Sequence, residues 1–284
     1  MATFLEKNSY GKHAINLSKI TRHADYHEFR QITVDTQLEG DFESVYLQGD
    51  NRSVLTTDTQ KNTVYALAKS HFTASVEEFA LYLANYFVSH EAPVQQATVE
   101  ITEHGWSRMQ PKESLHPHAY ISKGNEKHRT KVVYKETGTS IWSGISQLLI
   151  LKTTDSAFEG FLRDRYTTLP EASDRILATE CEVSWLWNAT GIDFASLYVD
   201  IRNTLLETFA HHKSLSVQQT LYAMGEAVLE KFREVEEIEL VMPNKHHIPF
   251  NLEQFGIQNN NEIFVATDQP YGYITGTVKR SPSL

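Results

Sequence analysis

The sequence contains an internal repeat whose offset is half the length of the chain. The chain has 284 residues, and Lys61-Asn62-Thr63 and Arg202-Asn203-Thr204 lie 141 residues apart. The same offset separates Ser75-Val76-Glu77-Glu78 from Ser216-Val217-Gln218-Gln219. Self-similarity at a fixed offset indicates a repeated structural unit. We therefore expect two tandem repeats, residues 1–139 and 140–284.

Each four-residue match predicts the start of a helix. Ser75 with Glu78, and Ser216 with Gln219, form capping boxes: the serine hydroxyl accepts a free backbone N–H, and the acid or amide reaches back. An apolar stripe at helical spacing follows each box: Val76, Phe79, Ala80, Leu83 and Phe87 in the first, and Val217, Leu221, Met224, Val228 and Phe232 in the second. A further helix is expected before each, at about residues 59–70 and 193–212.

Alternating segments flank the helices and predict strands. They are Glu28–Leu38 and Phe42–Gln48, joined by a tight turn at Glu39-Gly40, then Val94–Thr102, and stretches near 131–137, 140–152, 181–188 and 235–242. The fold class is therefore α+β, with paired helices covering one face of an antiparallel sheet. Such an open sheet leaves exposed edges. Subunits joined edge to edge into a barrel would cover them, so we expect a homo-oligomer.

Composition excludes several classes of protein. A net charge of −10 argues against a surface for nucleic acid or an anionic membrane. The single cysteine, Cys181, excludes an intrachain disulfide, fits a reducing compartment and is expected to be a buried thiol. The sequence shows neither a signal peptide nor a membrane span, and it ends in Ser281-Pro282-Ser283-Leu284 instead of the peroxisomal Ser-Lys-Leu. We expect a cytoplasmic protein.

An aromatic ladder follows the apolar strand Leu148–Leu151. The segment from Lys152 to Arg175 reads KTTDSAFEGFLRDRYTTLPEASDR. It sets Phe158, Phe161, Tyr166, Leu169 and Arg175 at intervals of three, five, three and six residues. This segment resembles the signature of the urate oxidase family. Four other groups resemble that family's motifs in the family's order: Tyr10-Gly11-Lys12, Thr56-Thr57-Asp58 with Lys61-Asn62-Thr63, Ser216-Val217-Gln218, and Pro243-Asn244-Lys245-His246.

The resemblance implies a fold, an assembly and a reaction. The fold would be two tandem tunnelling-fold repeats, and the assembly a homotetramer of two stacked barrels with active sites at subunit interfaces. The reaction would be the cofactor-free oxidation of urate by O2 and water to 5-hydroxyisourate and hydrogen peroxide. The sequence has no G-x-G-x-x-G, no Walker motif and no cysteine cluster. An oxidase of this kind needs an electron-rich substrate that reacts directly with oxygen once it is deprotonated.

Three residues have the chemistry to bind an anionic oxopurine. The Arg175 guanidinium can bond bidentately to a planar anion, the Gln218 amide matches a lactam edge, and the Phe158 ring offers a stacking face. Taken without the resemblance, they would be a surface ion pair, a helix-surface residue and a core residue. By resemblance, Leu169 and Val217 form apolar walls, and Asn244 faces the oxygen or water site.

Lys12, Thr57 and His246 suggest a proton relay, because a threonine hydroxyl can both donate and accept between a lysine and a histidine. Without the resemblance, the N-cap role is the preferred interpretation of Thr57, since Thr57 and Gln60 also match a capping box. By resemblance, Thr57 and Asp58 are presented to the site of the neighbouring subunit.

Two other functions remain open. His104, His116 and His118 could hold a zinc ion in a pterin-handling enzyme of the same fold, although Pro117 indicates a loop and the spacing is loose. We expect no metal. A non-catalytic purine-binding protein is the other alternative, and the complete set of Lys12, Thr57 and His246 speaks against it.

Overall fold

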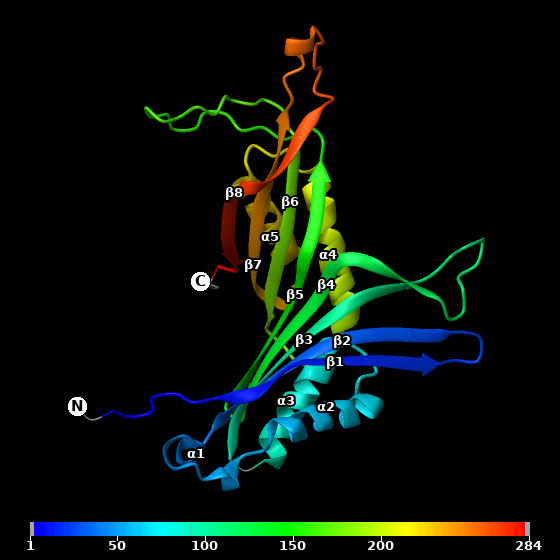
Figure 1. Ribbon diagram of the computed structural model, residues 1–284, viewed down its shortest axis with the longest axis vertical. Helices are drawn as coiled ribbons and strands as arrows, with labels where there is room; N and C mark the ends of the chain where they lie inside the picture. Colours follow the sequence, from blue (N-terminus) through cyan, green and yellow to red (C-terminus); the bar gives the residue numbers. More distant parts are fainter. Residues whose placement is uncertain (1–2, 92, 282–284) are drawn as a thin grey trace. The chain divides into compact units, whose positions relative to one another are not determined.

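The computed structural model describes residues 3–91 and 93–281 (Figure 1). The chain divides into two compact units: Met1–Gly144 with Leu186–Tyr198, and Ile145–Trp185 with Val199–Leu284. Of the C-terminal tetrapeptide compared with a targeting signal, residues 282–284 lie outside the described residues. Among the described residues, no helix is long and apolar enough to cross a membrane.

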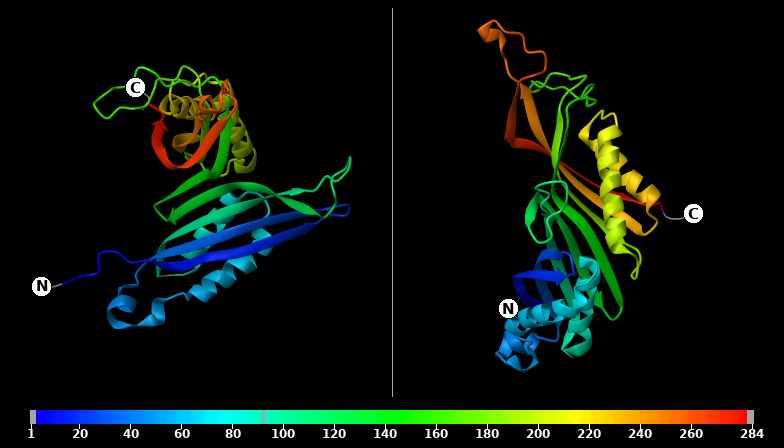
Figure 2. Two further views of the ribbon diagram at one scale, coloured as in Figure 1. Left: turned by 45° about the horizontal axis from the view of Figure 1, so that its top comes forward. Right: turned by 90° about the vertical axis from the view of Figure 1, so that its right-hand side faces the viewer.

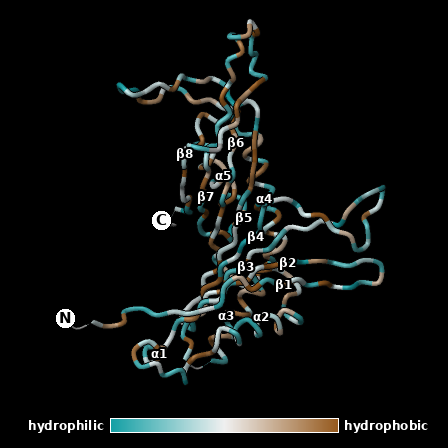
Figure 3. The backbone as a smooth tube through the Cα atoms, viewed as in Figure 1, coloured by the Kyte–Doolittle hydropathy of each residue, from teal (hydrophilic) through white to brown (hydrophobic). Residues whose placement is uncertain are grey.

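The first unit contains an antiparallel sheet whose strands follow the chain order. The strands are β1 (Tyr10–Arg22), β2 (His27–Gly40), β3 (Val94–Arg108), β4 (Tyr120–Lys135) and the start of β5 (Gly138–Lys152). Leu38 pairs with Tyr10 on one side and with Ala97 on the other. The turn between β1 and β2 is hydrophilic (Figure 3). Side chains on β2 alternate between buried and half-buried, as a strand with one core face requires.

Helices α1 (Glu43–Gln48), α2 (Thr57–His71) and α3 (Val76–His90) lie wholly in the first unit, with a short 3₁₀ turn η1 (Asn51–Ser53). Helix α2 packs on β1, and α3 packs on β3 and β4, so both cover one face of this sheet (Figure 2). The α3 stripe predicted from sequence is completely buried. This arrangement brings the first turn of α2 to the N-terminal end of β1.

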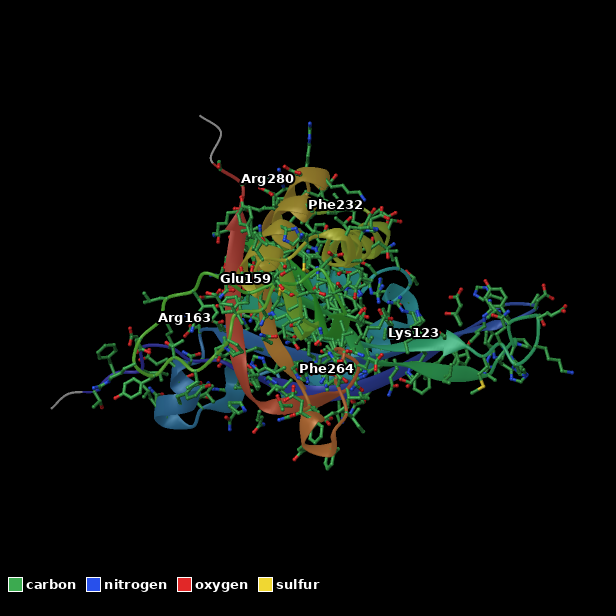
Figure 4. All side chains as sticks on the ribbon, turned by 90° about the horizontal axis from the view of Figure 1, so that it is seen from above. Lys123, Glu159, Arg163, Phe232, Phe264 and Arg280 are labelled. Carbon is green, nitrogen blue, oxygen red and sulfur yellow. The ribbon has the colours of Figure 1, made fainter. Side chains whose placement is uncertain are left out.

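The second unit contains the end of β5, most of β6 (Leu177–Trp187) and most of α4 (Phe194–His211). It also contains α5 (Val217–Lys231), β7 (Val235–Pro249), η2 (Glu253–Phe255) and β8 (Phe264–Lys279). Helix α5 packs on β7 and β8. The approach is close, because a Cβ on Gly225 would lie 2.6 Å from a methyl of Val278. Arg280 donates to the Phe232 carbonyl at 2.6 Å and so caps the C-terminus of α5 (Figure 4).

The predicted α+β class with an antiparallel sheet and covering helices is confirmed. The strand predicted at Phe42–Gln48 is wrong, because the structure forms helix α1 there. Phe42 is buried edge-to-face against Tyr10, and Gly49 ends the helix at φ 70°. The predicted turn at Glu39-Gly40 is also wrong, because β2 continues through both residues and pairs them with β3.

The two predicted capping boxes differ. In the first, Ser75 and Glu78 make both reciprocal bonds. In the second, the Ser216 hydroxyl accepts the Gln219 N–H at 3.1 Å, while the Gln219 side chain accepts from Leu215 and not from Ser216. The Ser75–Glu78 prediction is therefore confirmed, and the Ser216–Gln219 prediction is half right.

Candidate active site

The first unit brings Lys12 close to the start of α2. The backbone N–H of Lys12 donates to the Thr36 hydroxyl at 3.2 Å, and that hydroxyl donates to Gln60 Oε1 at 2.8 Å. Thr36 and Gln60 are buried, and Gln60 lies one turn after Thr57. A buried hydrogen-bond chain thus fixes the strand that carries Lys12 against the helix that carries Thr57.

Thr57 does not cap its helix. The N-cap is Thr56, whose hydroxyl accepts the Thr59 N–H at 3.1 Å. The Gln60 side chain points into the core, toward Thr36 and the Leu55 carbonyl, and does not close a capping box. The N-cap interpretation of Thr57 is therefore wrong by one residue. Thr57 is half-buried in the first turn of α2, and its hydroxyl is not used by the cap.

Asp58 lies beside two cations. A hydrogen bond from Lys61, at 2.5 Å, and the charge of Lys61 hold the pKa of the Asp58 carboxyl below its ordinary value, and the charge of Lys12 acts in the same direction. Asn62 also donates to Asp58, at 3.0 Å. Lys12, Thr57 and Asp58 are thus neighbours within the first unit.

The second unit brings Phe158 and Arg175 together. Phe158 forms a two-bond antiparallel bridge with Ala172, with N–O distances of 2.7 and 3.1 Å. The Arg175 guanidinium carbon lies 5.2 Å from the centre of the Phe158 ring. Arg175 Nε is buried and has no hydrogen-bond partner among the described residues, and burial lowers the pKa of Arg175. A buried, unpaired N–H of a cation favours binding of an anion.

The start of α5 joins the same segment. Ser156 bridges to Ser214, and the Ala157 N–H donates to the Ser214 carbonyl at 2.8 Å. Val217 and Gln218 follow as the first two residues of α5, Val217 buried and Gln218 exposed. Phe158, Arg175 and Gln218 therefore come from three connected segments, and the exposed amide of Gln218 lies where free helix N–H groups favour an anion.

The structure shows no hydrogen bond, ion pair or ring contact that joins the remaining predicted residues of the second unit, Leu169, Asn244 and His246, to this group within the described ranges. Leu169 is 53% exposed on the loop between β5 and β6. Asn244 is buried on β7 opposite Gly272, and a register shift separates it from His246. The predicted relay is divided between the units, because Lys12 and Thr57 belong to the first unit and His246 to the second.

Two features near these residues were missed from sequence. Gln60 and Thr36 hold the strand of Lys12, and Asp174 binds the segment before Phe158. Gln60 had a detectable signal: it directly precedes Lys61-Asn62-Thr63, whereas Ile201 precedes the repeated Arg202-Asn203-Thr204. A glutamine where its repeat carries an apolar core residue indicates a buried polar role.

The structure gives His104, His116 and Cys181 ordinary surroundings. No group of three or more His, Cys, Asp or Glu that could hold a metal ion occurs within the described ranges. His116 Nδ1 accepts the backbone N–H groups of His118 and Ala119, and His104 contacts the Thr33 hydroxyl. Cys181 is fully buried as expected, and burial raises the pKa of its thiol to about 12.

Comparisons with known proteins give one answer. The family model described as Uricase matches residues 8–133 and 141–275. The uricase of Arthrobacter globiformis is 42% identical over 98% of this chain and 91% of its own length, and the uricase of Oryctolagus cuniculus is 36% identical over 98% and 95%. The crystal structure of uricase from Arthrobacter globiformis superimposes with a TM-score of 0.95 at 41% identity, covering 100% of this chain and 97% of that one.

Proposed function

The chain belongs to the uricase family, and we propose that it oxidises urate with O2 and water to 5-hydroxyisourate and hydrogen peroxide. Two electrons leave urate and reduce O2 to peroxide, while water supplies the oxygen of the new hydroxyl group. The single observation that carries the proposal to a site is the buried, unpaired Arg175 Nε beside the Phe158 ring.

Most of the substrate-binding residues are assigned to the second unit, and Thr57 and Asp58 of the first unit complete the set. Arg175 and Gln218 bond the edge of the purine anion, and Phe158 stacks on its face. Leu169 and Val217 form apolar walls, and Asn244 faces the O2 or water position. Support comes from the bridges that connect the segments of Phe158, Arg175 and Gln218.

Proton transfer is assigned to Lys12, Thr57 and His246, and Asp58 lies beside Thr57 as a further contact to substrate. The Thr57 hydroxyl, which the helix cap leaves available, passes a proton between the lysine and the histidine. Deprotonated urate then gives an electron to O2, and the fixed dipoles of the site stabilise the developing charge. No cofactor takes part.

The direct test is urate turnover. Purified protein mixed with urate in air should remove the ultraviolet band of urate and form peroxide in equal amount, and activity should survive exhaustive chelation. Arg175→Gln should weaken binding of urate and of 8-azaxanthine by about 30- to 1000-fold, because a charge-assisted bond to a desolvated anion is lost. A chelated, inactive enzyme that zinc restores would instead support a pterin-handling metalloenzyme.

We further propose that residues 1–139 and 140–284 are tandem tunnelling-fold repeats, and that the protein is a cytoplasmic homotetramer of two stacked barrels with Thr57 and Arg175 meeting across a subunit interface. Helices α3 and α5 begin at Val76 and Val217. Their separation of 141 residues equals the offset of the sequence repeat and supports the duplication. The open edges of antiparallel sheets favour assembly.

Shared sites predict rescue between damaged subunits. Thr57→Ala and Arg175→Gln chains, unfolded and refolded together, should recover about a quarter of parental activity, because half of randomly paired two-fold dimers are mixed and each regains one of two sites. Recovery should be absent when the two variants are refolded separately. No recovery despite demonstrated mixing would place the site within one chain.

A further inference from the structure

Asp174 directly precedes Arg175, yet its carboxylate bonds backbone N–H groups and a hydroxyl, and not the Arg175 guanidinium. One oxygen accepts the Thr154 hydroxyl at 2.8 Å, and the other accepts the Ser156 N–H at 3.3 Å. The Thr154 bond is the largest of the influences that hold the pKa of Asp174 below its ordinary value, and the N–H of Ser156 acts in the same direction. The carboxylate is therefore ionised at neutral pH and committed to the segment between β5 and Phe158.

These bonds are one of three connections that hold the loop carrying Phe158 in place. The Ser156–Ser214 bridge holds the segment to the approach of α5, and the Phe158–Ala172 bridge joins the two ends of the loop. Asp174 adds the third connection, between residues 154–156 and the residue before Arg175. The separation between the Phe158 ring and the Arg175 guanidinium thus depends on a carboxylate that touches neither.

The same bonds also leave the Arg175 guanidinium without a carboxylate partner in the part of the chain that the structure describes. Burial lowers the pKa of Arg175. Its Nε has no hydrogen-bond partner among the described residues, although the Asp174 carboxylate lies one position away in the chain. An aspartate whose carboxylate had no other hydrogen-bond donors nearby would be attracted to that guanidinium, and it would compete there with an anionic substrate. Thr154 and Ser156 supply the donors that keep Asp174 directed away.

We propose that Asp174, together with Thr154, is a positioning residue of the urate site: it fixes Phe158 and Arg175 at their working separation and leaves Arg175 unpaired for the substrate anion. The inference rests on the proposed function, because it concerns the same site. Asp174 touches no reacting atom, and its effect acts through Arg175 and Phe158.

The test compares urate kinetics and 8-azaxanthine binding in Asp174→Ala, Thr154→Val and Thr154→Ser. Arg175 and Phe158 contact the purine in both the ground state and the transition state, so their displacement should raise KM and the 8-azaxanthine Kd in parallel, with a smaller change in kcat. We expect a loss of about 10- to 100-fold in kcat/KM for Asp174→Ala, the scale of a displacement of about 1 Å. Thr154→Val should lose less, and Thr154→Ser, which keeps the hydroxyl, should be close to the parent.

The same loop contains a matched control. Asp164 accepts the Tyr166 N–H at 2.9 Å and the Thr167 hydroxyl at 2.9 Å, the same kind of donors that Asp174 uses. Its hydrogen bonds also hold the pKa of Asp164 below its ordinary value, with the Tyr166 N–H as the largest influence. Asp164→Ala and Thr167→Val remove a carboxylate and a hydroxyl from the loop without touching Phe158 or Arg175. They should leave KM and the 8-azaxanthine Kd within about 2-fold of the parent.

The outcomes separate this inference from the proposed function. A parent that oxidises urate and is damaged by Arg175→Gln, together with an Asp174→Ala variant of unchanged KM and Kd, would overturn the positioning role alone. Equal losses in the Asp174 and Asp164 variants would also overturn it, because any disturbance of the loop would then suffice. A folded parent that neither oxidises urate nor binds 8-azaxanthine would overturn the proposed function itself.

Discussion

Glu77 and Gln218 occupy the same position in two helices 141 residues apart, and the structure uses them in opposite ways. Each is the second residue of its helix and follows a serine cap and a valine. Glu77 is fully buried, whereas Gln218 is exposed. A duplicated helix start therefore supplies a core group in the first unit and an available amide in the second.

The surroundings of Glu77 explain the difference. His128 Nε2 lies 2.7 Å from Glu77 Oε1, and the Ser143 hydroxyl donates to the same oxygen. The His128 ring stacks on Tyr198 at 3.6 Å, and Trp187 donates to Ser143 at 2.7 Å. The first unit fills the space above this helix position with its own side chains, so a ligand has no access there.

The largest effect we predict is on stability, from a matched pair of alanine substitutions. Glu77→Ala leaves the half-buried His128 without its closest carboxylate and the buried Ser143 hydroxyl without its acceptor, and it should lower the free energy of unfolding by about 3–5 kcal/mol. Gln218→Ala removes an exposed side chain and should change it by less than about 0.5 kcal/mol. Urea unfolding at neutral pH measures both, and equal costs would contradict the comparison.

The cost of Glu77→Ala should depend on pH. Burial acts to raise the pKa of Glu77, but the charge of His128 and hydrogen bonds from His128 and Ser143 outweigh it and hold the pKa below the ordinary value of 4.5. A lowered folded-state pKa stabilises the protein above the unfolded-state value, and this contribution is lost as pH falls through the folded-state value. The difference in free energy of unfolding between the parent and Glu77→Ala should therefore have its full size at neutral pH and become smaller below about pH 4.

The second prediction reverses the ranking of the two residues. Gln218→Ala should weaken 8-azaxanthine binding by about 10- to 100-fold, because a hydrogen bond to a charged ligand contributes about 1.5–3 kcal/mol. Glu77 touches no ligand in the proposed site, so the folded fraction of Glu77→Ala should bind normally. Calorimetric titration at a temperature where both variants are folded provides the measurement.

Local sequence signals predicted the helices well. The apolar stripes after Ser75 and Ser216 fixed α3 and α5, because spacing and caps are properties of a few neighbouring residues. Helix α1 was missed because its six residues contain strand-favouring types. The bounds of β1 and β8 were also not predicted, because each strand is defined by pairing with a distant partner strand.

The candidate site was predictable by residue type but not by geometry. Family resemblance identified Arg175 and Phe158, and the structure adds their mutual contact and the buried Nε. Glu77 was interpreted only as a residue inside a capping box, because nothing local shows that His128, 51 residues later, covers it. Burial and long-range hydrogen bonds come from the tertiary fold, and a single sequence does not contain them in readable form.

The third prediction tests another difference between the repeats. Gln60 and Ile201 are both fully buried at equivalent positions before Lys61-Asn62-Thr63 and Arg202-Asn203-Thr204. Gln60→Ile or Thr36→Val alone should cost about 1–3 kcal/mol, because each leaves a buried polar partner unsatisfied. The double variant should lose less free energy of unfolding than the sum of the two single variants, because it removes both polar partners. It also places an isoleucine at the position that Ile201 occupies in the second unit. Additive costs in a double-mutant cycle would show that the bond between them is not the source.

The smallest predicted difference concerns the two serine caps. The Ser75 hydroxyl accepts the Glu78 N–H at 3.0 Å and also contacts the Glu78 carboxylate at 3.3 Å. The Ser216 hydroxyl accepts the Gln219 N–H at 3.1 Å, whereas the Gln219 side chain accepts the N–H of Leu215. Ser75→Ala removes a hydroxyl that accepts the Glu78 N–H and also donates to the Glu78 carboxylate, and it should cost about 1–2 kcal/mol. Ser216→Ala removes one bond and leaves the Gln219–Leu215 bond intact, so it should cost about 0.5–1 kcal/mol.

Hydrogen exchange can locate these costs, because a lost cap frays the first turn before it affects the rest of the fold. The Glu78 amide should lose more protection in Ser75→Ala than the Gln219 amide loses in Ser216→Ala. Ser89→Ala provides a control, because its hydroxyl bonds Asn85 on the exposed face of α3 and caps nothing. A larger loss at Gln219 than at Glu78 would show that the half-formed box stabilises its helix more than the complete one, against the order expected from the hydrogen bonds.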